Sequence, residues 1–238
     1  MADISTLEPA SPRPGGLRGV IADWASDQRT FKNVSWGKAM IWIFLLSDIF
    51  IFGCFLLSYM TARMSTLVPW PNPSEVFALH MFGADIPLIL IAIMTFVLIT
   101  SSGTMALAVN FGYRRDRKKT ALMLLVTAFF GAMFVGMQAF EWTKLISEGV
   151  RPWGNPWGAE QFGATFFMIT GFHGTHVTIG VIFLLIVARK VARGDYDTGR
   201  RGFFTSRRGN YESVEIMGLY WHFVDLVWVF IVAFFYLW

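Results

Sequence analysis

Five long apolar stretches dominate this chain and leave few folds open to it. They cover residues 38–62, 85–109, 120–141, 162–188 and 214–238. Each is about as long as the 20 or so residues that an α-helix needs to cross a bilayer. Their apolar side chains lie all round the helix rather than along one stripe, as expected of helices embedded in lipid. A membrane β-barrel would show short, alternating segments instead. The sequence therefore predicts an all-α, polytopic membrane bundle of five transmembrane helices.

Composition supports this fold and excludes a nucleic-acid-binding protein. Only 15% of the residues are charged, against about 25% in soluble domains. The net charge of +4 comes from basic residues that lie in the tail and loops, where membrane topology explains them. We divide the chain into a polar amino-terminal tail, residues 1–37, and a transmembrane domain, residues 38–238.

The distribution of Lys and Arg predicts the orientation. Seventeen basic residues fall in the tail through Lys38, in the loop 113–119 and in the loop 189–208, against three in the other two loops. Because basic loops stay in the cytoplasm, the amino terminus is expected inside and the carboxyl terminus outside.

Five ionisable side chains lie deep in the spans: Asp48, His173, His176, His222 and Asp225. Counted at 1.5 Å per residue, all five lie near the middle of a hydrocarbon core about 30 Å thick. A charge at that depth costs roughly 2.5 to 3.5 kcal/mol, so such residues usually face a partner helix, a water path or another subunit. We therefore predict a mid-membrane polar layer, which either handles protons or only locks helices together.

The residues alone do not decide between proton handling and helix packing. Asp48 either takes part in proton handling or fixes helix packing through a serine or a backbone group. His173 and His176 share one helix face, among small residues that allow close helix approach, where two imidazoles bonded across the interface would be structural. Gln138 and Glu141 form a motif at the outer end of the third span, where the carboxylate is expected to reach water.

Metal binding gives a hypothesis of a different class. The chain has four histidines, which are too few for the clustered histidine boxes of membrane di-iron enzymes. Two histidines with one carboxylate could still hold iron or zinc, and a pair on facing helices could hold a haem. A free-standing, His-ligated membrane metalloenzyme is therefore the rival hypothesis. The sequence holds no P-loop, dinucleotide fingerprint or nucleophile elbow.

Four runs of residues resemble subunit III of the haem-copper terminal oxidases, the cytochrome c oxidase subunit III family. They are Trp42–Phe52, Gln138–Glu141, the T-F-F-M-I-T-G-F-H-G-T-H-V run at Thr165–Val177, and the Y-W-H-F-V-D-L-V-W run at Tyr220–Trp228. The likeness covers about residues 36–238. Members of the mitochondrial type have seven spans, and this chain resembles the five-span bacterial forms.

Two features of these motifs indicate different electron donors, so the donor stays open. Asp48 stands where the family usually has Glu, which is reminiscent of quinol oxidases and of a related protein found with nitric oxide reductases. The run at Tyr220–Trp228 resembles cytochrome c oxidases instead.

The resemblance implies an accessory subunit with no catalytic residue, haem, copper or other metal of its own. In the family, the catalytic subunit I carries the haems and one copper, while subunit III flanks it, holds phospholipid and sustains proton uptake and stability. We therefore expect as partners subunit I, subunit II and phospholipid, without nucleic acid, in a bacterial inner (cytoplasmic) membrane. The complex would oxidise cytochrome c or a quinol with oxygen and translocate protons. By the same resemblance Asp48 matches the family's intramembrane carboxylate, and the other residues above fall on motif positions without assigned roles.

Overall fold

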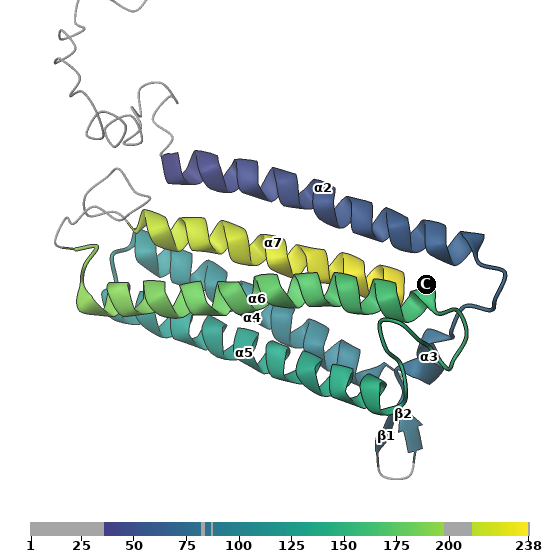
Figure 1. Cartoon of the computed structure of the whole chain (residues 1–238). Coiled ribbons are helices and arrows are strands. Elements are labelled where there is room, and N and C mark those ends of the chain that lie inside the picture. Colours follow the sequence, from purple (N-terminus) through teal and green to yellow (C-terminus); the bar gives the residue numbers. More distant parts are fainter. Residues whose placement is uncertain (1–35, 82–83, 87, 198–210, 238) are drawn as a thin grey trace, which may run out of the picture.

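The computed structural model describes residues 36–81, 84–86, 88–197 and 211–237, which form an elongated bundle of long helices running side by side (Figure 1). The long helices are α2 (Trp36–Ser65), α4 (Ile89–Tyr113), α5 (Arg117–Ser147), α6 (Gln161–Arg193) and α7 (Glu212–Phe235). In this part of the chain, all five are long and apolar enough to cross a membrane. The predicted five-span fold is confirmed, while residues 1–35 of the predicted tail lie outside the described residues.

The connection between α2 and α4 differs from the prediction. It holds the short helix α3 (Pro73–Val76) and a hairpin of β1 (Leu79–Met81) and β2 (Ala84–Ile86), paired antiparallel. The second span was expected to begin at residue 85, but the backbone is extended at Ile86 and α4 begins only at Ile89. The physical reason is Pro87, because the residue before a proline avoids the helical conformation.

Trp221 of α7 fills the centre of the bundle formed by α4, α5, α6 and α7. Its side chain is fully buried, and its indole Nε1 donates a hydrogen bond to Ser101 Oγ on α4 at 2.9 Å. A Cβ placed on Gly131 of α5 would lie 2.5 Å from Trp221, and one on Gly180 of α6 would lie 3.0 Å from it. Glycines on two helices therefore make room for one large ring, as is common where membrane helices approach closely.

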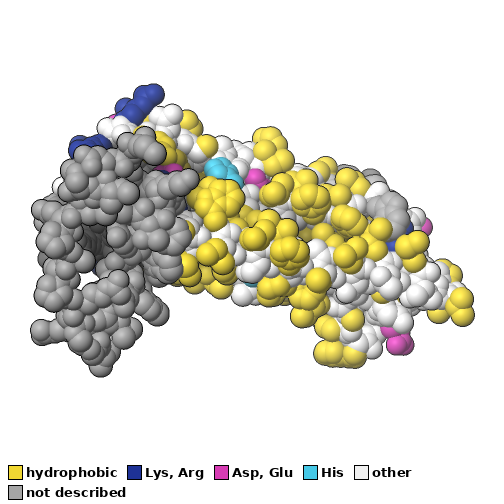
Figure 2. All heavy atoms as spheres, turned by 90° about the horizontal axis from the view of Figure 1, so that it is seen from above, with side chains coloured by type: hydrophobic (Ala, Val, Ile, Leu, Met, Phe, Trp, Pro, Cys, Tyr) yellow, Lys and Arg dark blue, Asp and Glu magenta, His cyan; other side chains and the backbone are white. Residues whose placement is uncertain are grey.

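Helix α2 lies at the edge of this bundle, along α6 and α7 (Figure 1). Its buried side chains include Leu45, Asp48, Phe52 and Tyr59, a spacing of three, four and seven residues that forms one stripe on a helix. Many of its other large apolar side chains, including Trp42, Ile43 and Phe50, are exposed. Figure 2 shows hydrophobic side chains along most of the described length of the molecule on the face seen from above. This apolar outer surface suits lipid or another subunit.

Polar contacts order the end of the bundle where α4 meets α5 and α6 leads toward α7. Asp116 caps α5, since its side chain accepts a hydrogen bond from the backbone N–H of Lys119 at 3.2 Å. That hydrogen bond lowers the pKa of the Asp116 carboxyl. Tyr211, just before α7, donates from its hydroxyl to Asp197 Oδ1 at 2.8 Å. Burial, with this contact, raises the pKa of Tyr211 to about 12, so the phenol remains a hydrogen-bond donor at neutral pH.

Candidate functional site

Asp48 and His176 form an ion pair between α2 and α6. The buried stripe of α2 directs Asp48 toward α6, where its Oδ2 lies 3.0 Å from His176 Nε2. The Asp48 side chain is almost fully buried, and Phe52, one turn further along α2, places its ring 5.8 Å from the His176 ring. The structure thus brings together two of the five predicted members of the polar layer.

The other ring nitrogen of His176 contacts the backbone of its own helix. Nδ1 lies 2.9 Å from the carbonyl oxygen of Phe172, and a carbonyl can only accept, so Nδ1 carries a hydrogen. An unprotonated Nε2 beside an ionised carboxylate would be repelled by it. The two groups attract each other only when the pair carries one proton more, as imidazolium beside carboxylate or as imidazole beside carboxylic acid. Asp48 Oδ2 makes no hydrogen bond of standard geometry, so we describe the contact as an ion pair.

His222 and Asp225 lie elsewhere, between α7 and α4. His222 Nδ1 is 2.6 Å from Ser102 Oγ, while Asp225 is half-buried with its Oδ1 enclosed and without a hydrogen-bond partner. A serine hydrolase needs a carboxylate that orients the imidazole through a hydrogen bond. Among the described contacts His222 bonds Ser102, but no hydrogen bond joins His222 to Asp225, so this trio lacks the carboxylate–imidazole contact of a nucleophilic triad.

His173 occupies an aromatic enclosure inside the bundle. Its ring stacks on Trp228 at 5.4 Å between centroids and meets Phe134 edge to face at 5.9 Å. Neither of its ring nitrogens has a hydrogen-bond partner. Trp228 donates its own Nε1 hydrogen to Thr95 Oγ1 at 3.1 Å. The predicted polar layer is therefore divided into three environments, and only Asp48 and His176 pair with each other.

The prediction that Glu141 reaches water at the end of a helix is wrong. Helix α5 continues to Ser147, and Glu141 is only 3% exposed. Gln138 Nε2 donates to Glu141 Oε2 at 3.0 Å, and the hydroxyl of Tyr236 donates to the same oxygen at 3.1 Å. Tyr236 covers the carboxyl from the end of α7, which the spacing of the third span alone could not indicate.

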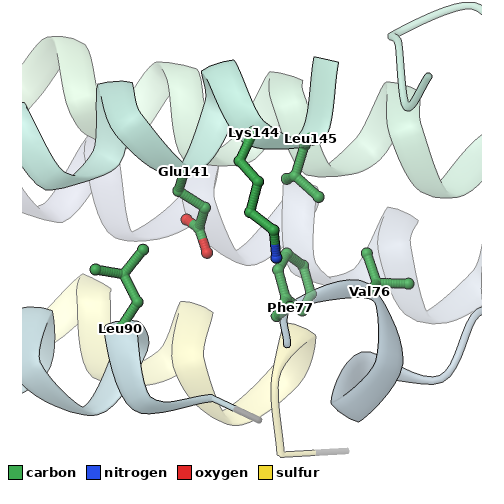
Figure 3. A pocket seen from close by; sticks show the side chains of 6 residues that line it. All are labelled: Val76, Phe77, Leu90, Glu141, Lys144 and Leu145. Carbon is green, nitrogen blue, oxygen red and sulfur yellow. The ribbon is translucent and has the colours of Figure 1, made fainter. Parts of the chain in front are cut away.

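Glu141 also borders a small cavity (Figure 3), which Val76, Phe77, Leu90, Lys144 and Leu145 complete. Lys144 donates from Nζ to the carbonyl oxygen of Ala78 and lies 3.5 Å from Glu148 Oε1. A buried carboxyl, a partly buried ammonium group and apolar walls thus meet at this end of the bundle.

Three residues of these clusters were not singled out by the sequence. Ser102 and Lys144 are ordinary residues for a helix interior and a helix end, and Tyr236 follows the last predicted motif. The polar run Thr100–Ser102 within an apolar span is the one signal that could have indicated a partner for His222.

Within the described ranges, no group of three or more His, Cys, Asp or Glu side chains is close enough to hold a metal ion. The side chain of His80 lies outside that description. The described residues therefore give the metalloenzyme hypothesis no geometric support.

Comparison with known proteins decides the family. The model of the family described as cytochrome c oxidase subunit III matches residues 25–238. The chain belongs to this family. It is 31% identical over 207 residues to the probable quinol oxidase subunit 3 of Staphylococcus epidermidis, covering 86% of this chain and 90% of that protein. The protein of the same name from Staphylococcus aureus is 30% identical over 206 residues, with the same coverage. The chain is thus a multi-pass membrane protein and an accessory subunit III of a haem-copper oxidase, as its resemblance predicted.

Proposed function

We propose that this chain packs against the catalytic subunit I of a bacterial respiratory oxidase, beside subunit II, and sustains proton uptake and stability over many turnovers. Haem and copper then belong to the partner subunits. The amino terminus lies in the cytoplasm, since most basic residues fall on that side of the predicted topology. Family membership and five apolar helices with exposed outer faces support this role.

The Asp48–His176 pair is the observation that carries the proposal. In its singly protonated, neutral form the pair places one proton between α2 and α6. It does so on α2, whose most apolar window has the smallest buried share of the five helices. Water is absent from a hydrocarbon core, so a charge appearing in a neighbouring subunit acts strongly on a nearby ionisable pair. The pair can therefore tune the field felt by protons that enter the catalytic subunit.

Removing the subunit tests the supporting role. The complex without this chain is expected to start at a rate close to that of the intact complex and then to lose activity faster with each turnover. Adding the purified chain back should restore the lifetime. A stripped complex that keeps full activity over many turnovers would show that the chain is not needed for support.

Asp48→Asn tests the pair itself, because asparagine keeps the shape of the side chain but cannot hold the proton. The variant complex is expected to assemble, to shift the pH dependence of turnover and to inactivate sooner. Glu160→Gln is the matched control, since Glu160 is an exposed carboxylate at the start of α6 that makes no side-chain capping bond. An unchanged pH profile and unchanged inactivation kinetics would reduce Asp48 to a packing residue.

The name of the relatives favours a quinol as the electron donor. Both of the staphylococcal proteins above are called probable quinol oxidase subunit 3, and Asp48 is consistent with that branch. Oxygen consumption by the purified complex should then be rapid with a reduced quinol and slow with reduced cytochrome c. The opposite preference, or a partner that reduces nitric oxide, would reject this assignment.

Bound phospholipid is the last part of the proposal. The outer face of α2 exposes large apolar side chains, and each Lys or Arg near an anionic membrane surface contributes about 1 kcal/mol of attraction. Lipid analysis of the purified complex should find phospholipid that is lost together with this subunit. Equal lipid content with and without the subunit would contradict it.

A further inference from the structure

The outer cap segment, residues 73–78, covers the end of the bundle where Glu141 lies. Phe77 places its ring 4.4 Å from the Tyr236 ring and 5.4 Å from the Phe166 ring. Lys144 of α5 donates to the carbonyl oxygen of Ala78. The segment is therefore attached to α5, α6 and the end of α7 by both aromatic and polar contacts.

Glu141 and Lys144 retain hydrogen-bonding capacity that these contacts do not use. Both donors to the Glu141 carboxyl, Gln138 and Tyr236, bind Oε2, so neither occupies Oε1. An ammonium group has three donor hydrogens. On Lys144, one is donated to the Ala78 carbonyl oxygen, and a second faces the Glu148 carboxylate in an ion pair. Both residues line the cavity, and the contacts named above leave one donor hydrogen of Lys144 and the second carboxyl oxygen of Glu141 for a further partner.

The cavity between these groups has the size of one water molecule. The space open to water is about 10 Å³, close to the minimum of about 10 to 15 Å³ that a buried water requires. Both a carboxyl and an ammonium group line it (Figure 3), and a buried water typically makes about three hydrogen bonds to such groups. The other side chains among the described lining residues, Val76, Phe77, Leu90 and Leu145, are apolar, so Glu141 and Lys144 supply the polar side chains of this described lining.

We propose that this cavity holds one water molecule, which bridges the Glu141 carboxyl and the Lys144 ammonium group and so fastens the outer cap segment to α5. This water site lies apart from the Asp48–His176 pair and does not depend on the role proposed for that pair. Its consequence is structural: the water completes the polar contacts that hold residues 73–78 in place on the outer face of the subunit.

A cavity-filling substitution distinguishes a wet cavity from a dry one by the sign of its effect. Val76 is buried and lines the cavity, so Val76→Ile adds a methyl group where the water would lie. In the assembled complex, the backbone N–H groups of Phe77 and Ala78 report on the cap, because each is hydrogen-bonded within it. Displacing the water should make their hydrogen exchange about tenfold faster, the effect of one lost buried hydrogen bond. A dry cavity predicts unchanged or slower exchange, because the added methyl group would fill empty space.

The same substitution in a Glu141→Met chain distinguishes displacement of the water from a steric clash of the added methyl group. In a Glu141→Met chain the water has lost its carboxyl partner, so adding Val76→Ile should have little further effect on the exchange of Phe77 and Ala78. Equal acceleration in both backgrounds would indicate crowding and overturn the proposal. Val150→Ile is the matched control, because Val150 is equally buried but does not line the cavity, and it should leave these two amides unchanged.

Discussion

Helix α2 and the four-helix group of α4 to α7 are held in different ways. Only 17% of the most apolar window of α2 is buried, against 50% of the corresponding window of α7. The four-helix group is joined by large rings fitted against glycines, as at Trp221 and Gly131. Helix α2 is attached by one buried stripe that contains an ion pair, Asp48 with His176, and an aromatic contact of Tyr59 with Phe235 at 4.1 Å.

The difference matters because lipid removes the usual driving force for helix association. Lipid tails are as apolar as leucine, so close packing and polar contacts decide which membrane helices associate. The four-helix group combines close packing with buried hydrogen bonds between helices, such as that of Trp221 with Ser101, whereas α2 buries a smaller share of its length and depends on fewer contacts. Substitutions that change side-chain shape should therefore cost more in the four-helix group than on α2.

Truncating the central ring should have the largest effect. Trp221→Ala removes a fully buried side chain and is expected to cost about 3 to 5 kcal/mol of unfolding free energy. Trp42→Ala is the control on α2, where the ring is 59% exposed and the expected change is within about 0.5 kcal/mol. Unfolding of the purified subunit in detergent measures both. Similar losses for the two variants would remove the distinction between the regions.

A single methyl group gives a sharper test of packing. Gly131→Ala would bring its Cβ to 2.5 Å from Trp221 and 2.7 Å from Val181, which should cost about 1 to 3 kcal/mol. Gly136→Ala, on the same helix, meets nothing within 4 Å and should be neutral or should stabilise by up to about 1 kcal/mol through helix propensity. The same unfolding measurement applies, and a tolerated Gly131→Ala would mean that the packing around Trp221 is loose.

The ion pair between Lys38 and Glu215 should contribute less. It joins the beginnings of α2 and α7 at 2.8 Å, with side chains 30% and 26% exposed. Glu215→Gln is expected to lower the unfolding free energy by about 0.5 kcal/mol at low salt and by less at high salt, because ions screen an accessible pair. Comparing the two salt conditions checks this, and a large effect that is independent of salt would contradict it.

Acid should weaken the start of α5 slightly. The folded-state pKa of Asp116 is lowered by the Lys119 N–H, so the cap stabilises the fold above the unfolded pKa of about 3.9 and loses that contribution as pH falls through the folded value. Asp116→Asn keeps a capping oxygen but does not titrate. The stability difference between the two proteins should therefore change in acid; parallel pH curves would show that ionisation of Asp116 contributes nothing to stability.

Sequence reasoning predicted the spans well because their signal is length and hydropathy, which lipid imposes on each helix separately. Boundaries were less accurate where local chemistry acts, as at Pro87, which delays α4 to Ile89. The same level in the membrane made Asp48 and His176 candidates for pairing. Depth alone could not show which helices are neighbours, so it could not separate that pair from His222, which bonds Ser102 instead.

The environment of the Glu141 side chain also could not be predicted from the sequence. Its position near the end of an apolar run indicated contact with water, but Tyr236 and Gln138 enclose it. These contacts join the ends of two helices and arise only when the bundle closes. Packing between distant segments was thus the information that hydropathy did not contain.

A double-mutant cycle on the pair between α2 and α6 tests the central claim most directly. Asp48→Asn, His176→Asn and the double variant are compared by the number of turnovers that each assembled oxidase completes before it inactivates. If the two residues act as one proton-holding unit, the double variant should inactivate no faster than the more severe single variant. Effects that multiply would show that Asp48 and His176 act independently, and the shared proton would not be the basis of the subunit's support.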